Sequence, residues 1–501
     1  FILLINSLQL EELQQHLLSS QAKMKVPRLL PPTVIVALVT TLVVAVGAEP
    51  CSSDEGNQQG ECTNLPKSHN VIWHPHLTWG QKLVSYLANF FIPFRSLGQT
   101  IIGSPEAKKY TEKLRKTIHD RDILLGKKNI QEWSKASEDS LLAESAGSIP
   151  FRNDILKEWN IVDELDVIPI ALNIREEVKI LVRFPSTLLA PEVKRGNILD
   201  YSGCIEVEFD LIDLRNFAPD VPILIMYHGG GMMSGGNHDA KALEEIASLV
   251  QMAEQNNELI TISIDYGLSP ENVFPTAIIE GLSVIEYVLS NKTRKIHITG
   301  LSSGANLSLV TGLESFRRYP GRILSIQSQS PFLNPAGDTM SYYMNQNVFP
   351  DIEWLRWCWR AYIGLEPPES SEDRSEQTNT KLELLLRKSS NYSSWNKWKT
   401  KYSSKSLQRL IYPTLDLPSN LNDEKNAPKI IIRVNLADPL YDDGKEIADA
   451  LKNEKADITF FEDKGLHVNT GSQANAKAHN KVLKLWSDII FGGGESKNDE
   501  I

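Results

Sequence analysis

The chain has 501 residues, of which 41% are hydrophobic and 23% are charged, and its formal net charge at pH 7 is −11. This ordinary globular composition fits one large α/β domain with insertions, or two or three smaller domains. The acidic balance, without a basic stripe or a Lys/Arg block, argues against nucleic acid as a partner. Four cysteines are too few for a disulfide scaffold in a chain of this length.

The N-terminal region carries a targeting pattern. A basic stretch at residues 24–28 precedes an uncharged run at residues 33–46, and small residues, Gly47 and Ala48, follow it. The run is shorter than the roughly 20 residues that a membrane span needs, whereas residues 29–48 reach that length but contain two prolines. Residues 1–48 are therefore expected to hold an upstream segment and either a cleaved signal peptide or a signal anchor that associates with a membrane. Both place the rest of the chain in the secretory pathway, at the endoplasmic reticulum membrane with a lumenal catalytic domain, or outside the cell.

A linker and a helical, cap-like region are expected over residues 49–165. Cys51 and Cys62 lie in the polar linker, where they either form a disulfide in an oxidising lumen or remain unpaired thiols. Residues 65–165 are rich in aromatic side chains and are expected to be helical. The apolar residues 83–94 are too few to span a bilayer; they line a substrate entrance, lie on a membrane surface or pack on the core.

Strand patterns begin near residue 177. Residues 178–184 and 204–211 alternate apolar with polar side chains, as half-buried strands do, and residues 222–227 form a continuous apolar run typical of a central parallel strand. Further strands are expected at residues 258–265, 295–301, 323–330, 429–437 and 457–462. Helices are expected at residues 240–255, 278–289, 444–451 and 473–489, and directly after residue 304. This alternation predicts an α/β fold with a mostly parallel, doubly wound sheet and helices on both faces.

One stretch interrupts the alternation. Residues 332–427 contain a Trp- and Tyr-rich segment around residues 354–362 that is expected to be helical, and then a polar stretch at residues 366–381. We interpret it as an insertion near the site, with its Trp cluster more expected in the core than against a ligand. The domain that carries this insertion is expected over residues 166–490, and a polar tail over residues 491–501.

The strand at 295–301 ends in a Gly-x-Ser-x-Gly turn, from Gly300 through Ser302 to Gly304. A strand-to-helix turn this tight strains its central residue, and glycines two positions before and after keep the neighbouring backbones apart. It would present the Ser302 hydroxyl as a nucleophile. Glycine and serine are common in loops, so the pattern is weak evidence by itself.

A nucleophilic serine needs a base that takes its proton and a carboxylate that orients the base. Asp438 follows the strand at 429–437, and His467 follows the last strand, 29 residues later. The order Ser, Asp, His is the one that this sheet topology generates. Asp442 and Asp443 are competing carboxylates, but they open a helix and are expected to cap it. No group of residues has metal-ligand spacing, and neither a metal nor a cofactor is expected.

A glycine-rich motif, His228-Gly229-Gly230-Gly231, follows the apolar run at 222–227. Backbone without side chains lets N–H groups point at an oxygen that develops negative charge. Gly230 and Gly231, with the N–H of Ser303, are therefore expected to form an oxyanion hole. A flexible turn is the alternative; a phosphate-binding loop is excluded because no Lys-Ser/Thr pair follows.

Together these motifs resemble the hormone-sensitive-lipase-like family of α/β-hydrolases (alpha/beta hydrolase fold-3), over about residues 175–490. The matching segments are residues 228–231, 265–275, 300–304 and 438–440, and His467. The resemblance implies an α/β-hydrolase fold with a helical cap. The signal-anchored N-terminus is similar to arylacetamide deacetylases and fungal steryl acetyl hydrolases, which remove acetyl groups from lipophilic esters. Gly267 stands where this family usually has Arg, which implies the loss of an ion pair; Leu301 replaces an acidic residue, and Ser303 replaces Ala.

The sequence thus predicts a serine carboxylesterase or deacetylase that acts on a small lipophilic ester with a short or acetyl acyl group. Two alternatives remain: a non-catalytic ligand-binding protein, as among gibberellin-receptor-like members of the family, and acyl transfer to an alcohol. Residues 291–293 and 391–393 match the pattern of glycan acceptors.

Overall fold

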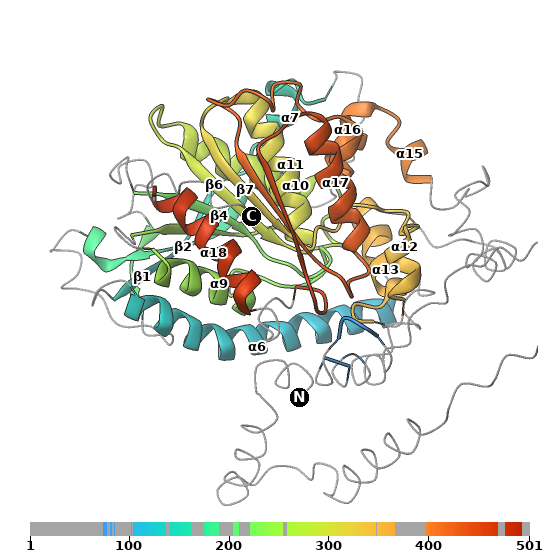
Figure 1. Ribbon diagram of the computed structural model, residues 1–501, viewed down its shortest axis with the longest axis horizontal. Helices are drawn as coiled ribbons and strands as arrows, with labels where there is room; N and C mark the ends of the chain where they lie inside the picture. Colours follow the sequence, from blue (N-terminus) through green and yellow to red (C-terminus); the bar gives the residue numbers. More distant parts are fainter. Residues whose placement is uncertain are drawn as a thin grey trace, which may run out of the picture.

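A computed structural model of the protein describes most of the expected α/β domain and parts of the region before it (Figure 1). The described residues are 74–77, 81–82, 85, 102, 104–136, 141–162, 175–189, 204–209, 221–253, 258–346, 348–365, 397–468 and 476–492. The expected targeting segment, Cys51, Cys62, the candidate glycan acceptor at 391–393 and the polar stretch at 366–381 lie outside them.

A nine-stranded sheet forms the centre of the described part, in the order β3-β1-β2-β5-β4-β6-β7-β8-β9. Its strands are β1 (Leu142–Pro150), β2 (Glu177–Pro185), β3 (Ile205–Glu206), β4 (Ile223–Tyr227), β5 (Ile260–Asp265), β6 (Ile296–Leu301), β7 (Ile323–Gln329), β8 (Lys429–Asn435) and β9 (Ile458–Asp463). β2 pairs antiparallel with β1 and with β5, and all other pairs are parallel. The mostly parallel α/β sheet predicted from the sequence is confirmed.

Helices cover both faces of this sheet (Figure 1). Their bounds are α6 (Pro105–Ala136), α7 (Ile155–Glu158), α9 (Ala240–Gln251), α10 (Thr276–Leu289), α11 (Ser303–Arg318), α12 (Met340–Met344), α13 (Ile352–Ile363), α15 (Lys397–Lys401), α16 (Lys405–Ile411), α17 (Tyr441–Asn453) and α18 (Ala476–Phe491). Short 3₁₀ turns lie at Ser186–Leu188 and Pro413–Leu415. The long helix α6 runs along α9, which also contacts α18.

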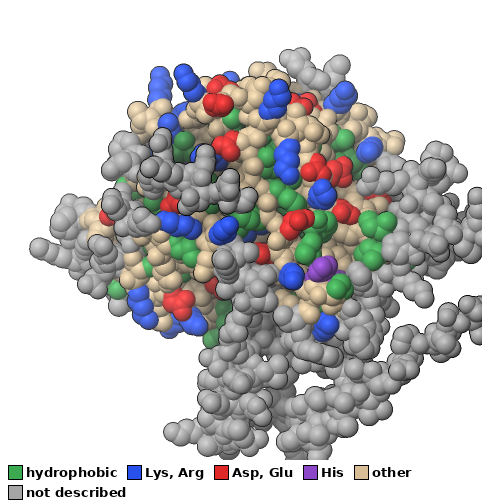
Figure 2. All heavy atoms as spheres, viewed as in Figure 1, with side chains coloured by type: hydrophobic (Ala, Val, Ile, Leu, Met, Phe, Trp, Pro, Cys, Tyr) green, Lys and Arg blue, Asp and Glu red, His purple; other side chains and the backbone are tan. Residues whose placement is uncertain are grey.

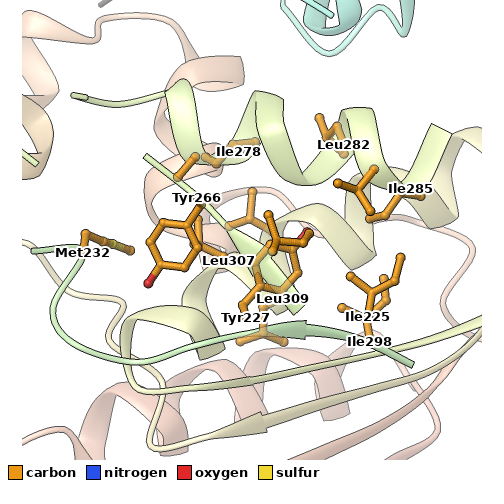
Figure 3. Close-up of a cluster of buried hydrophobic side chains, with 14 of the residues drawn as sticks. Ile225, Tyr227, Met232, Tyr266, Ile278, Leu282, Ile285, Ile298, Leu307 and Leu309 are labelled. Carbon is orange, nitrogen blue, oxygen red and sulfur yellow. The ribbon is translucent and has the colours of Figure 1, made fainter. Parts of the chain in front are cut away.

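Strand β4 shows how one apolar run serves two cores. Ile225 and Tyr227 belong to the cluster that α10 and α11 complete, and Figure 3 draws them among side chains of those helices. Leu224 and Met226 point to the other face and join side chains of α6, α9 and α18. Because successive strand residues face opposite sides, a central strand covered on both faces is apolar throughout.

Two expectations about secondary structure were wrong. Residues 142–150 form β1, although all of residues 65–165 were expected to be helical. This strand is rich in Ala, Ser and Gly and lacks a strand pattern of its own, but it pairs with β2 along its whole length. Tertiary pairing therefore overrides local propensity here. Of the strand expected at 204–211, only Ile205–Glu206 forms in the described residues.

The insertion expected at 332–427 contributes α12, α13, α15 and α16. In α13, Trp357, Trp359 and Tyr362 are buried, which agrees with a core role for the aromatic cluster. Cys358 of α13 is a buried free thiol, and Cys204 is also buried. The polar Asp351 side chain caps α13 by accepting hydrogen bonds from the N–H groups of residues 353 and 354.

Charges of both signs lie interspersed on the face drawn in Figure 2, with no field of basic side chains among its coloured atoms. None of the helices in the described part of the chain combines the length and the apolar character that crossing a membrane requires.

Candidate active site

The Gly-x-Ser-x-Gly residues form a sharp turn between β6 and α11, here called the serine turn (residues 300–304). Ser302 has φ 56° and ψ −117°, a left-handed conformation that a non-glycine residue adopts only when its surroundings enforce it. Its N–H donates to the carbonyl oxygen of Gln329 at the end of β7 (2.8 Å), and its own carbonyl oxygen accepts from Ala305 N (3.0 Å). The backbone of the sheet and of α11 thus holds the strained residue.

The two glycines of the serine turn are required by close backbone approaches. A Cβ on Gly300 would lie 2.0 Å from the carbonyl oxygen of Gly304. A Cβ on Gly304 would lie 2.3 Å from the carbonyl oxygen of Tyr227, at the end of the neighbouring strand β4. Both of these oxygens are main-chain atoms, so no change of side-chain rotamer can make room for a Cβ.

The structure brings Ser302, His467 and Asp438 into one hydrogen-bonded line. His467 Nδ1–H donates to Asp438 Oδ2 at 2.8 Å, which leaves Nε2 as the acceptor for the Ser302 hydroxyl, also at 2.8 Å. Asp438 is 0% exposed, whereas Ser302 and His467 are 6% and 8% exposed. The Asp438 carboxylate is therefore shielded from water, whereas the side chains of Ser302 and His467 each keep a small exposed area.

The loops after β8 and β9 are joined to each other. Asn435 Nδ2 donates to the carbonyl oxygen of Leu466 (2.7 Å), the residue before His467. Asp438 Oδ1 accepts from the N–H of Leu440 (2.9 Å), so both carboxylate oxygens are occupied. These bonds fix the imidazole and the carboxylate relative to each other.

The segment Gly229–Ser234, here called the glycine loop, lies against the serine turn. A Cβ on Gly229 would be 3.4 Å from Ser302 Cβ. Gly230, Gly231 and Met232 have φ values of 117°, 65° and 61°. Within the described part of the chain, the N–H groups of Gly230 and Gly231 make no hydrogen bond, and Ser303 N–H lies at the N-terminus of α11, where helical N–H groups are unpaired. These three groups are thus available to an anionic oxygen.

Neighbouring segments hold the glycine loop. Asp239 caps α9, and its Oδ2 accepts from Gly229 N–H (3.3 Å). The N–H of Ser269, in the loop after β5, donates to the carbonyl oxygen of Met232 (2.8 Å). The Met232 side chain is buried beside Tyr266 (Figure 3).

His228 packs on Tyr266 and supports the glycine loop. Its ring stacks on that of Tyr266 with centroids 4.1 Å apart, and Tyr266 Oη–H donates to its carbonyl oxygen (2.8 Å). Nδ1–H donates to the carbonyl oxygen of Gly229 (2.8 Å). Burial lowers the pKa of His228, so the ring is a neutral structural support at neutral pH.

The expectation that Asp442 and Asp443 cap the helix they open was wrong. Asp443 Oδ2 accepts from the N–H groups of Leu333 and Asn334, both at 3.0 Å, and Asp442 Oδ2 accepts from Ser341 N–H at 2.7 Å. Both carboxylates therefore hold the insertion after β7 and not the first turn of α17. Burial raises the pKa of Asp443 well above its usual range.

An ion pair near Gly267 involves an arginine from another segment. Glu280 of α10 accepts from Gly267 N–H and from Arg175 Nη1 (2.7 Å). A Cβ on Gly267 would lie 2.7 Å from Asn272 Cγ, which leaves no room for a larger residue. The buried Glu280 therefore has a cationic partner although position 267 is glycine.

Sequence reasoning missed residues far from the motifs. Asn345, in the insertion, donates through Nδ2 to the carbonyl oxygen of Asp438 (2.9 Å), and its Oδ1 lies 2.9 Å from Nε2 of the buried His74. Arg115 of α6 donates to the carbonyl oxygen of Met233 in the glycine loop (2.8 Å). No local pattern marks these residues. Asp239 was readable as an N-cap before an amphipathic helix.

Comparisons with known proteins agree with this architecture. The sequence model of the alpha/beta hydrolase fold family matches residues 224–468. Carboxylesterase NlhH from Mycobacterium tuberculosis is 25% identical over 161 residues, which are 29% of this chain and 48% of that protein. The gibberellin receptor GID1B from Arabidopsis thaliana is 25% identical over 162 residues, 31% of this chain and 43% of the receptor. The chain thus spans about half the length of the curated relatives that it matches.

Among solved structures, a Pyrobaculum calidifontis esterase in a monoclinic form is 15% identical with a TM-score of 0.46. That similarity covers 76% of this chain and 93% of the esterase. Residues 224–468, which contain the glycine loop, the serine turn and the loops of Asp438 and His467, match the model of this family and have the α/β-hydrolase fold.

Proposed function

We propose that this protein is a serine hydrolase that cleaves carboxylic esters through an acyl-enzyme. The observation that supports the proposal most strongly is the buried line from Asp438 through His467 to Ser302, with 2.8 Å at each contact. The esterases among its relatives support ester hydrolysis as the reaction class.

In the first half-reaction, Ser302 Oγ attacks the ester carbonyl carbon while His467 Nε2 takes the hydroxyl proton. Asp438 accepts the Nδ1–H bond, keeps the ring in the tautomer whose Nε2 is free to accept, and stabilises the imidazolium that forms. The N–H groups of Gly230, Gly231 and Ser303 bind the carbonyl oxygen as it becomes an oxyanion. Each such donor typically contributes about 3–4 kcal/mol of transition-state stabilisation.

Collapse of the tetrahedral intermediate expels the alcohol, whose oxygen takes the proton from His467 Nε2. In the second half-reaction a water attacks the acyl carbonyl while His467 again takes a proton. The acid leaves, and the proton returns to Ser302 Oγ. No step needs a metal or a cofactor.

A short acyl group, such as acetyl, on a lipophilic alcohol is our proposed substrate class. Helix α13 packs on the glycine loop so closely that a Cβ on Gly231 would lie 2.6 Å from Cys358 Sγ and 3.0 Å from the Trp354 ring. This contact supports a small space beside the proposed oxyanion donors, and the apolar surroundings suit a lipophilic ester. Acyl transfer to an alcohol would use the same first half-reaction.

A non-catalytic, receptor-like role is the second candidate, because one relative is a gibberellin receptor. Such a role does not need a base bonded to the serine. The joined Ser302, His467 and Asp438 therefore favour the enzyme.

The test is hydrolysis of p-nitrophenyl acetate and longer p-nitrophenyl esters by wild type and by Ser302→Ala. We expect turnover by wild type, a preference for the shorter chains, and a loss of about 10⁴-fold or more in kcat in Ser302→Ala. Equal, background-level rates for the two proteins would contradict the proposal.

We also propose a secretory location for the domain, from the signal pattern within residues 1–48. Protease protection of intact microsomes tests it, since a lumenal domain resists digestion until detergent is added. Digestion without detergent would refute the lumenal location and leave the chemistry untouched.

A further inference from the structure

Helix α6 precedes the family-matched region, residues 224–468, yet one of its side chains reaches the glycine loop. Arg115 Nε donates to the carbonyl oxygen of Met233 (2.8 Å), and its Nη2 donates to the carbonyl oxygen of Ser269 (2.7 Å). Glu271 holds the same guanidinium through two bonds, from Nη1 at 3.1 Å and from Nη2 at 2.8 Å. The side chain is 26% exposed, so water screens part of its charge.

The Met233 carbonyl is linked to the proposed oxyanion hole through the backbone. Met233 C=O and Ser234 N–H belong to one planar peptide group, and Ser234 N–H donates to the carbonyl oxygen of Gly230 (3.2 Å). Gly230 C=O and Gly231 N–H belong to the next peptide group in this chain of bonds. The guanidinium therefore stands at one end of a series of aligned peptide dipoles, and the Gly231 N–H stands at the other.

The backbone of this loop also needs support. Gly230, Gly231 and Met232 are consecutive residues with positive φ, and Met232 is not glycine. Such a run persists only where the surroundings over-determine it. Ser269 N–H holds the Met232 carbonyl at 2.8 Å, and Arg115 holds Ser269 in turn through its carbonyl. Arg115 thus supports the loop at two points.

We propose that Arg115 is a positioning residue for the oxyanion hole: it fixes the glycine loop and, through two peptide groups, orients and polarises the Gly231 N–H toward the developing oxyanion. Glu271 holds the guanidinium in place. This inference rests on the proposed ester hydrolysis, because it assigns the Gly231 N–H a role in that reaction. It makes the efficiency of the hydrolase domain depend on a helix that precedes it.

The first experiment compares Arg115→Met and Arg115→Lys with wild type on p-nitrophenyl acetate, with kcat expressed per active site titrated by a fluorophosphonate. Arg115→Met is expected to lower kcat about tenfold, less than the 100-fold or more that follows deletion of a donor outright, with KM changed less than about twofold. Arg115→Lys keeps the positive charge and one hydrogen bond, and its kcat is expected to lie between those of wild type and Arg115→Met. Lys116→Met is the matched control, because Lys116 lies on the same helix with its side chain 78% exposed, and its kcat should equal that of wild type.

A second measurement separates oxyanion positioning from a general structural role. The inhibition constant of an aryl trifluoromethyl ketone, whose adduct carries an oxyanion, should rise by the same factor as kcat/KM falls across the variants. Guanidinium ion at millimolar concentration should restore part of the activity of Arg115→Ala and none of that of Ser302→Ala.

Unchanged kcat per titrated site in both Arg115→Met and Arg115→Lys would overturn the inference, as would a loss that comes wholly from fewer titratable sites. If Arg115→Met does not fold, the Arg115→Lys value decides by the same criterion. Failure of the proposed function has a different signature: wild type itself would neither hydrolyse the ester nor react with the fluorophosphonate.

Discussion

The serine turn and the glycine loop lie against each other and both contain left-handed backbone, but they are held in different ways. Main-chain atoms of β4, β7 and α11 hold the serine turn, as the close approach of Gly304 to the Tyr227 carbonyl shows. The glycine loop is held largely by side chains from elsewhere: Arg115 of α6, Asp239 before α9, and Cys358 of α13. Main-chain atoms of the sheet and of α11 therefore position the proposed nucleophile, whereas the proposed oxyanion donors depend on side chains from outside the sheet.

The largest effect should come from filling the serine turn. Gly304→Ala places a Cβ 2.3 Å from the Tyr227 carbonyl oxygen, and we expect the free energy of unfolding to fall by about 3 kcal/mol or more, with activity lost. No side-chain truncation should rescue it. Denaturant unfolding measures the change, and Gly236→Ala is the control, because its nearest neighbour would be 3.8 Å away. A Gly304→Ala protein as stable and active as Gly236→Ala would contradict this account of the turn.

The effect of adding a side chain at Gly231 in the glycine loop should be partly reversible by a second substitution, because the nearest obstacle is the Cys358 side chain. Gly231→Ala brings a Cβ to 2.6 Å from Cys358 Sγ, and we expect kcat to fall about 100-fold. Adding Cys358→Ala should recover about tenfold of this loss, and not all of it, because φ at residue 231 stays at 65°. Steady-state hydrolysis of p-nitrophenyl acetate measures both. A double variant no more active than Gly231→Ala would show that the contact with α13 does not restrict the loop.

A pH-dependent effect on stability concerns Asp122 of α6, which lies beside Asp239, the residue that holds Gly229. Burial, and then the charge of Asp239, raises the pKa of Asp122 from 3.8 to about 7, although Arg121 and the N–H of Ala240 act in the opposite direction. Because this folded-state pKa lies above the unfolded one, the native state binds more protons between about pH 4 and pH 7. This carboxyl therefore lowers stability as the pH rises through that window.

Asp122→Asn removes this ionisation and can still accept from Ala240 N–H. We expect the variant to be more stable than wild type by about 2–4 kcal/mol at pH 8, with the difference vanishing near pH 4. Urea unfolding at several pH values measures it, and Asp120→Asn, exposed on the same helix, is the control. If the stability of Asp122→Asn and of wild type changed with pH in parallel, the pKa of Asp122 would not be raised in the folded state.

The difference between the serine turn and the glycine loop also explains how much of this site could be predicted from the sequence. Ser302, Asp438 and His467 were predictable because parallel strands end at one edge, so motifs at strand ends must meet there. Arg115 was not, because it meets Met233 across 118 residues of sequence without any local pattern. The same holds for Asp442 and Asp443, whose hydrogen-bond donors lie in the insertion, and for β1, whose strand character comes from pairing with β2.

The most direct test of the central claim is to locate the nucleophile by intact-protein and peptide mass spectrometry after reaction with a fluorophosphonate. If Ser302 is the nucleophile, we expect one adduct per chain, on the peptide that contains Ser302, which persists in Ser303→Ala and disappears in Ser302→Ala. An unreactive wild-type protein, or an adduct that remains in Ser302→Ala, would contradict it.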